Sequence, residues 1–304
     1  MVSGEMLEEA RRLKEERDAV VLAHYYVTPD AQDLADYVGD SFYLSRKAAT
    51  LDCRTIVFAG VRFMAESAKL LSPDKTVLMP EPSADCPMAH MVRRETVDAA
   101  RARYGDDLAV VCYVNSTTEM KALSDVCVTS SNAVGIVRAL PQSNVLFVPD
   151  MNLGHYVATE VPEKNVILND GVCPTHESID VAEVDEARAQ HPDALVLAHP
   201  ECGAWVLEKA DVVGSTSQLI DAAVASDARE FIVCTVYGVI HELERRTEGT
   251  GKRFFFPRTT PVCPNMARVT AERVLACLRD GTGEGGLPDE SVIARSTAAL
   301  DRML

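Results

Sequence analysis

The sequence of 304 residues contains no uninterrupted run of eighteen apolar residues, so it predicts no membrane-spanning helix. Positive charge is limited, because 30 lysines and arginines stand against 46 aspartates and glutamates, for a formal net charge of −16. A surface this acidic repels phosphate backbones, which argues against nucleic acid as a partner. Residues 1–18 are charged and lack the apolar segment of a secretory signal, so we expect a cytoplasmic protein.

The nine cysteines include no Cys-x-x-Cys pair, which is the spacing typical of structural zinc sites. Their number is odd, and the chain is long enough to form its own hydrophobic core. Both facts, together with the absent secretory signal, argue against a framework of disulfide bonds.

A repeat with a period near 87 residues runs through the chain. The strand-like segment VVLAHYY recurs as VVCYVNS and LVLAHPE, and three further blocks recur at steps of 86 to 90 residues. The repeat places residues in equivalent positions as follows: His24 with Tyr113 and His199, Ser41 with Ser130 and Thr216, and Cys86 with Cys173 and Cys263.

Each copy of the repeat alternates helical stretches with short runs rich in valine and isoleucine. This alternation predicts an α/β fold of three pseudo-symmetric αβα domains, each with a small parallel sheet of about four strands, around a central active site. We expect domains at 1–88, 89–175 and 176–265, with C-terminal helices in 266–304 packing back on the first. The glycine-rich segment 281–286 is expected to be a flexible link between those helices.

One cysteine in each copy directly precedes proline, namely Cys86, Cys173 and Cys263. Three thiolates around one axis suit a metal, and a 4Fe–4S cluster held by them would keep one iron open as a Lewis acid. The alternative is that all three are small buried hydrophobic residues. The remaining cysteines lack this context and are expected in the core: Cys53, Cys112, Cys127, Cys202, Cys234 and Cys277.

Polar residues follow the predicted strands, at the edge where open parallel sheets bind ligands. Ser41, Ser130 and Thr216 each begin a predicted helix, where a hydroxyl either caps the helix or helps to bind an anion. Glu201 is a candidate general base. Candidates for binding or orienting a substrate are His24, Tyr26, Tyr113, Asn115, His176 and His199. Weaker signals come from His90, His155, His191 and His241.

Several stretches resemble the quinolinate synthase family over about residues 20–280, among them LAHYY, VGDS, CPMA, PDMNLG, CPTHE, HPEC and CPNM. The resemblance implies three homologous αβα domains around a 4Fe–4S cluster that has three cysteine ligands and a fourth iron open to substrate. It implies a transferase of NAD biosynthesis that condenses iminoaspartate with dihydroxyacetone phosphate to quinolinate, phosphate and water. An aspartate oxidase or dehydrogenase would supply the iminoaspartate.

The resemblance also implies roles for individual residues. It makes Cys86, Cys173 and Cys263 the metal ligands and gives catalytic roles to Tyr26, Tyr113 and Glu201. It places His176 near the cluster and implies substrate binding by His24, Ser41, Tyr113, Asn115, Ser130, His199, Glu201 and Thr216. The sequence departs from the family at Val236, where an acidic residue is expected. No second cysteine lies near Cys263, so a thiol switch there is not expected.

Three other functions stay open at this point. A different hydro-lyase with an open-iron cluster would act on another hydroxy acid, and a requirement for a phosphorylated substrate separates it from quinolinate synthase. A non-catalytic iron–sulfur carrier or sensor would need a fourth protein ligand, which the repeat does not offer. A zinc-stabilised binding protein would contain no acid-labile sulfide.

Overall fold

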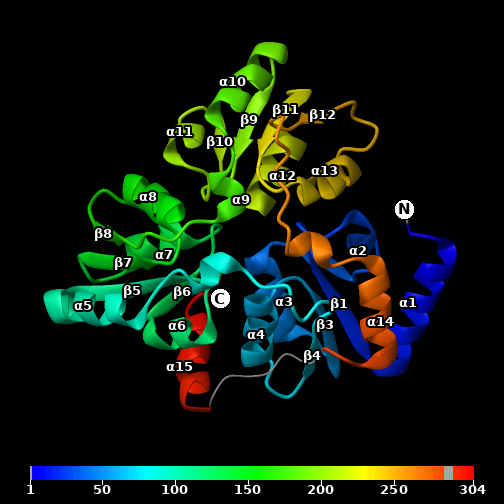
Figure 1. Ribbon diagram of the computed structural model, residues 1–304, viewed down its shortest axis with the longest axis horizontal. Coiled ribbons are helices and arrows are strands. Elements are labelled where there is room, and N and C mark those ends of the chain that lie inside the picture. Colours follow the sequence, from blue (N-terminus) through cyan, green and yellow to red (C-terminus); the bar gives the residue numbers. More distant parts are fainter. Residues whose placement is uncertain (1, 284–289) are drawn as a thin grey trace.

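The computed structural model describes residues 2–283 and 290–304, and its chain forms three separate sheets of four parallel strands each (Figure 1). The strand order is the same in all three sheets: β2-β1-β3-β4, β6-β5-β7-β8 and β10-β9-β11-β12. The predicted α/β fold with three small parallel sheets is therefore confirmed. Of the expected flexible link at 281–286, residues 284–286 lie outside the described residues.

The strands are short and apolar because helices cover both faces of each parallel sheet. They are β1 (Ala19–His24), β2 (Tyr37–Gly39), β3 (Thr55–Ala59), β4 (Thr76–Leu78), β5 (Leu108–Tyr113), β6 (Val126–Val128), β7 (Asn144–Val148), β8 (Asn165–Leu168), β9 (Leu195–Ala198), β10 (Val212–Val213), β11 (Glu230–Cys234) and β12 (Arg253–Phe255).

The helices follow the same repeat. Those around the first sheet are α1 (Gly4–Arg17), α2 (Pro29–Asp33), α3 (Ser41–Thr50) and α4 (Arg62–Leu71). Around and after the second sheet lie α5 (Arg94–Tyr104), α6 (Thr118–Leu123), α7 (Ala133–Ala139), α8 (Met151–Glu160) and α9 (Pro174–Glu177). The third sheet has α10 (Val181–Gln190), α11 (Ala204–Leu207), α12 (Thr216–Ala225) and α13 (Ile240–Arg246). The C-terminal helices are α14 (Ala271–Asp280) and α15 (Glu290–Asp301), and 3₁₀ turns span Pro87–His90, Gly105–Asp107, Tyr237–Val239 and Met266–Arg268.

An aspartate that precedes the second strand of each repeat fixes the first strand. Its carboxylate accepts a hydrogen bond of 2.7–2.8 Å from a backbone N–H of that strand and pairs, at 2.6–3.3 Å, with a cation of the opening helix. The three sets are Lys14–Asp36–Val21, Arg101–Asp125–Val110 and Arg188–Asp211–Val196. These aspartates recur at steps of 89 and 86 residues, so the repeat extends to the contacts that hold each sheet.

The three repeats differ in how their apolar cores connect. The first two repeats share one continuous cluster of buried side chains, which also includes residues of α14 and α15. The third repeat has two smaller clusters. Helix α14 packs on α1 and α2, whereas α15 lies against α6 and α4 (Figure 1). The domain boundaries expected from the sequence stay a prediction.

Among the described residues, no helix combines the length and the apolar character needed to cross a membrane.

Candidate active site

A cavity of about 110 Å³ lies where the ends of the three sheets meet, and it receives side chains from all three repeats. Every candidate site residue named from the sequence lines it: His24, Tyr26, Ser41, Cys86, Tyr113, Asn115, Ser130, Cys173, His176, His199, Glu201, Thr216 and Cys263. The weaker candidates His90, His155, His191 and His241 lie outside this lining. The structure thus brings the candidates together, while the role of each stays a prediction.

The residues that cap the helices at the cavity are not the three hydroxyl residues considered from the sequence. Ser41 and Thr216 are the first residues of α3 and α12, but the capping side chains are those of their neighbours Asp40 and Ser215. Ser130 lies in the turn that precedes α7. The hydroxyls of all three residues are therefore not used as helix caps, because an adjacent residue or turn takes that role. The hydroxyls of Ser130 and Thr216 instead face His199 and Tyr26.

Two of the strand-end histidines are held as neutral donors. The backbone N–H of Tyr26 donates to His24 Nδ1 at 3.2 Å, and the N–H of Glu201 donates to His199 Nδ1 at 3.3 Å. Burial lowers the pKa of His24 to about 4 and that of His199 to about 3, so both rings are neutral near pH 7. Because Nδ1 accepts in each ring, the proton resides on Nε2. In His199 this atom lies 3.2 Å from the hydroxyl of Ser130.

Glu201 is a buried carboxylate that neighbouring donors keep ionised. Its side chain is 4 % exposed, and burial alone would raise its pKa. His176 Nδ1 lies 2.8 Å from Oε2, and the Tyr113 hydroxyl donates to Oε1. Together with His199, these groups hold the pKa of Glu201 well below its usual range. Burial and the adjacent Glu201 raise the pKa of Tyr113 well above its ordinary value, so this phenol keeps its proton.

A continuous chain of hydrogen bonds connects Glu201 to Tyr26. From Glu201 it passes to His176, whose Nε2 lies 2.8 Å from the Thr235 hydroxyl. The Tyr26 hydroxyl lies 2.7 Å from the Thr235 hydroxyl and 2.7 Å from that of Thr216. Sequence reasoning missed Thr235 because the equivalent positions in the other two repeats are Gly60 and Pro149, so the repeat gave no matching polar residue.

The three thiols begin short turns or helices on equivalent loops. Cys86 precedes the turn Pro87–His90, Cys173 directly precedes α9, and Cys263 precedes Pro264. Burial raises the pKa of all three thiols, that of Cys86 to about 12, and the Glu201 carboxylate acts in the same direction. Each thiol must therefore release a proton when it binds a metal.

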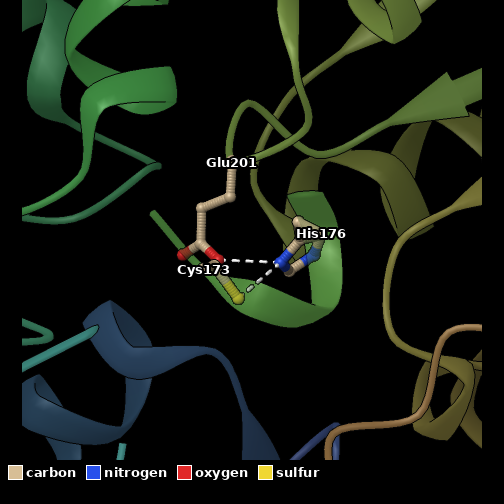
Figure 2. A group of neighbouring side chains, drawn as sticks. All are labelled: Cys173, His176 and Glu201. Atoms are coloured by element: carbon tan, nitrogen blue, oxygen red, sulfur yellow. Dashed lines mark hydrogen bonds and ion pairs between the residues drawn. The ribbon is translucent and has the colours of Figure 1, made fainter. Parts of the chain in front are cut away.

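One compact group in the site has the donor atoms of a metal site. Figure 2 shows Cys173, His176 and Glu201 converging, and their ligand atoms all lie within 4.8 Å of one another. Among the described residues, no group this compact contains two of the three cavity thiols. Cys86 and Cys263 line the same cavity, so three thiols in total face the space beside this group.

Two further residues support the site without having been predicted from the sequence. The side-chain amide of Asn152, on α8, donates to the backbone carbonyl of Glu201 at 3.1 Å and to the Glu177 carboxylate at 2.7 Å. Asp40 accepts from Ser131 at 3.1 Å and from Ser215 at 3.4 Å, so its carboxylate joins all three repeats beside the cavity. Both residues make hydrogen bonds to other repeats, and comparing the sequence with itself does not detect such contacts.

The remaining sequence-based expectations concern the other cysteines and Val236. The six cysteines outside the Cys-Pro context are all free and buried, as expected. Val236 is 2 % exposed and lines the cavity, so an apolar side chain occupies the wall where the family resemblance led us to expect an acid.

The fold and the cavity define an α/β enzyme whose central cavity is shared by three repeats and combines thiols with hydroxyls, histidines, tyrosines and a carboxylate. The family model described as Quinolinate synthetase A protein matches residues 8–304, and the chain belongs to this family. Similar relatives are the quinolinate synthases of Caldicellulosiruptor bescii, 48 % identical over 97 % of this chain and 96 % of the relative, and of Alkaliphilus metalliredigens, 46 % identical over 98 % and 97 %. The quinolinate synthase of Aquifex aeolicus is 42 % identical over 99 % and 94 %. The family and the function predicted from the sequence are thus confirmed.

Proposed function

We propose that this chain forms quinolinate from iminoaspartate and dihydroxyacetone phosphate, with release of phosphate and water, in NAD biosynthesis. The observation that carries the proposal is the single cavity that joins three thiols, an ionised carboxylate and three hydroxyls at helix starts. Both substrates are anions, and a chain with a net charge of −16 needs local donor sites to bind them.

The proposed cofactor is a 4Fe–4S cluster held by Cys86, Cys173 and Cys263, with the fourth iron open to substrate. The three thiols that line one cavity support this assignment, because cysteine thiolates are the usual ligands of iron–sulfur clusters. When bound, the cluster would supply an open iron that polarises a substrate hydroxyl, which then leaves as water.

Anion binding is assigned to the wall of the cavity that the helix starts form. The hydroxyls of Ser41, Ser130 and Thr216 lie there, and the N-termini of α3 and α12 add backbone N–H groups and favourable helix dipoles. The neutral rings of His24 and His199 add Nε2–H donors without adding charge. These groups would hold the carboxylates and the phosphate of the two substrates.

Proton transfer is assigned to Glu201, Tyr113 and Tyr26. Glu201 is assigned as the proton acceptor because its carboxylate is ionised and lines the cavity, although the groups that lower its pKa also weaken it as a base. Tyr113 and Tyr26 both keep their protons, since burial raises the pKa of each well above its ordinary value. They therefore serve as donors of hydrogen bonds or protons. Asn115 donates to Glu201 at 3.4 Å, and its buried carbonyl oxygen has no partner among the described residues, so it can accept from the substrate.

An anaerobic turnover assay tests this function. Protein reconstituted with iron and sulfide receives dihydroxyacetone phosphate and freshly generated iminoaspartate, and quinolinate is quantified. We expect quinolinate from the wild type and from the matched control Cys53→Ala, which alters a buried cysteine outside the cavity. We expect none from Cys173→Ala and none when dihydroxyacetone phosphate is omitted.

Two results would contradict the proposal. Undiminished quinolinate from Cys173→Ala would remove the cluster from the reaction. No quinolinate from wild-type protein with an intact cluster would favour a hydro-lyase acting on another hydroxy acid, or would show that Val236 changes the chemistry. The partner aspartate oxidase or dehydrogenase and the cytoplasmic location stay predictions.

A further inference from the structure

We propose that three buried polar side chains, Glu81, Asn169 and Glu183, form a closed ring of tethers that sets the positions of the three cavity thiols. The ring joins three Cys-Pro loops, defined here as loop 1 (79–92), loop 2 (169–176) and loop 3 (256–269). This inference rests on the cofactor proposed above. The three residues are 4 %, 6 % and 6 % exposed, whereas the arginines that pair with the two glutamates reach out to solvent.

Glu81 ties loop 1 to loop 3. Within loop 1 its Oε1 accepts from the backbone N–H of Ser83 at 3.0 Å and from the Ser83 hydroxyl, which shapes the approach to Cys86. The same carboxylate pairs with Arg268, at 3.6 Å, and with Arg273 at the start of α14. Arg268 also donates to the Ser83 hydroxyl. Loop 1 thus meets the segment that follows Cys263.

Asn169 ties loop 2 to loop 1. Its side-chain amide donates at 2.8 Å to the backbone carbonyl of Met91, which ends the turn after Cys86, and at 2.8 Å to that of Pro149. The two loops approach closely here, because a Cβ added at Gly171 would lie 2.8 Å from Met91 Cβ and 2.6 Å from the Pro149 carbonyl oxygen. Loop 2 therefore lies directly on loop 1, two residues before Cys173.

Glu183 closes the ring between loop 3 and the segment that follows loop 2. It lies in the first turn of α10, ten residues after Cys173, and both of its oxygens accept bonds from loop 3. Oε2 accepts from the backbone N–H of Thr259 at 2.6 Å, and Oε1 accepts from the Thr259 hydroxyl at 2.8 Å and from Arg258 at 3.3 Å. These contacts fix loop 3 four residues before Cys263.

No disulfide bond fixes the positions of the three thiols, because all nine cysteines are free. The thiols are only partly buried against the edge of the main apolar cluster, so polar contacts between the loops add to the packing that positions them. Glu81 and Asn169 hold loop 1 to loops 3 and 2, and Glu183 supplies the remaining link. A buried carboxylate that loses its partners is costly, so each contact resists separation of the loops it joins. Partners beyond the ligands themselves commonly change metal affinity about 10–100-fold.

The first test measures release of iron from reconstituted protein in excess chelator. Glu81→Gln and Glu183→Gln are compared with the control Glu242→Gln, which alters an equally buried glutamate paired with Arg245 at 2.8 Å on α13. We expect about 10–100-fold faster release from the two tether variants and wild-type release from the control. Equal release from all three variants, at matched thermal stability of the metal-free proteins, would overturn the proposal.

The second test uses the metal-free protein, where hydrogen exchange reports on the loops directly. We expect Glu81→Gln to raise exchange in loops 1 and 3, Asn169→Ala in loops 1 and 2, and Glu183→Gln in loop 3 and the start of α10. A uniform rise across the chain, or no rise, would show that these residues stabilise the fold without positioning the thiols. If Glu81→Gln does not fold, Ser83→Ala keeps the ion pairs of Glu81 and is expected to show the same pattern more weakly.

The two tests separate this inference from the proposed function. A wild-type protein that takes up no iron and sulfide would refute the proposed cofactor, while the exchange pattern would still decide on the tethers. A wild-type protein that binds the cluster and makes quinolinate, with tether variants that behave like Glu242→Gln, would refute the tethers alone.

Discussion

The two walls of the cavity are built in different ways. The wall of strand ends and helix starts places its polar groups directly after β1, β5 and β9, and these groups bond to one another, as Glu201 does with Tyr113 and His176. The wall of thiols lies on loops, and its contacts run from loop to loop through side chains such as Glu81 and Glu183. The comparison indicates that the strand-end wall, the proposed substrate wall, is pre-organised by the sheets, whereas the thiol wall, the proposed cofactor wall, relies on contacts between loops.

Removal of the metal should abolish activity while leaving the strand-end wall of the cavity intact. We expect chelated, metal-free protein to lose turnover completely, because the open iron is proposed to activate the leaving hydroxyl. The strand-end wall should persist, so circular dichroism should be unchanged and inorganic phosphate should still raise the thermal midpoint. Turnover should return on reconstitution with iron and sulfide. Full activity without metal would contradict the role of the cofactor wall.

Glu201→Gln should lower turnover without changing the amount of metal that the protein binds. The amide keeps the shape of the side chain but cannot accept a proton, so we expect turnover to fall about 10²–10⁴-fold. The iron and sulfide content and the visible spectrum should match the wild type. Glu66→Gln is a suitable control, since Glu66 is partly buried and accepts from Thr118 at 2.8 Å outside the cavity. Retained turnover in Glu201→Gln would remove this residue from the mechanism.

Thr235→Val tests whether the hydrogen-bond chain from Glu201 to Tyr26 contributes to turnover. Valine has a similar volume but lacks the hydroxyl that joins His176 to Tyr26, so the hydrogen-bond chain is cut. We expect kcat to fall about 10-fold, equivalent to about 1.4 kcal/mol, with an unchanged cluster spectrum. Thr235→Ser restores the hydroxyl and should restore most of the rate. Equal rates for the valine and serine variants would show that the chain does not contribute to turnover.

The smallest expected effect concerns buried thiols that belong to neither wall. Burial raises the pKa of Cys234 and of Cys277 to about 12, above the ordinary thiol value of about 8.5. Between these values the unfolded chain has lost protons that the native protein keeps, so the free energy of unfolding falls as the pH rises. Each thiol contributes a slope of up to about 1.4 kcal/mol per pH unit between about pH 9 and 12.

Urea unfolding at pH 8, 9 and 10 measures this slope, and Cys234→Ala should reduce it by the share of one thiol. An identical slope in Cys234→Ala and the wild type would show that the native thiol ionises as readily as the unfolded one.

The sequence predicted those features that occur three times. Short β-branched runs at constant spacing are visible without a structure, so the three parallel sheets and the three Cys-Pro loops followed directly. The aspartates Asp36, Asp125 and Asp211 recur at the same steps and offered a signal of the same kind, although they were not recognised. Features present once per repeat can be found by self-comparison even when no single copy is informative.

The sequence did not predict contacts that break the threefold pattern. Thr235 aligns with glycine and proline in the other repeats, and Glu81 and Glu183 tether different loops by unrelated contacts. The partners of these three residues are far away along the chain. Their contacts form only when the repeats pack together, and local sequence propensity does not predict that packing. The caps of α3 and α12 lie one residue before Ser41 and Thr216, because the adjacent Asp40 and Ser215 are also residue types that cap helices.

The central cavity has a consequence for the cohesion of the whole chain. Apolar packing of Tyr25 in a cluster of the third repeat joins the repeats, and so do polar contacts at the cavity, among them the bonds of Tyr26 to Thr216 and Thr235. A ligand that fills the cavity touches all three repeats at once, and its binding free energy is added to the stability of the bound state. The proposed substrates and cofactor would thus also hold the three repeats together.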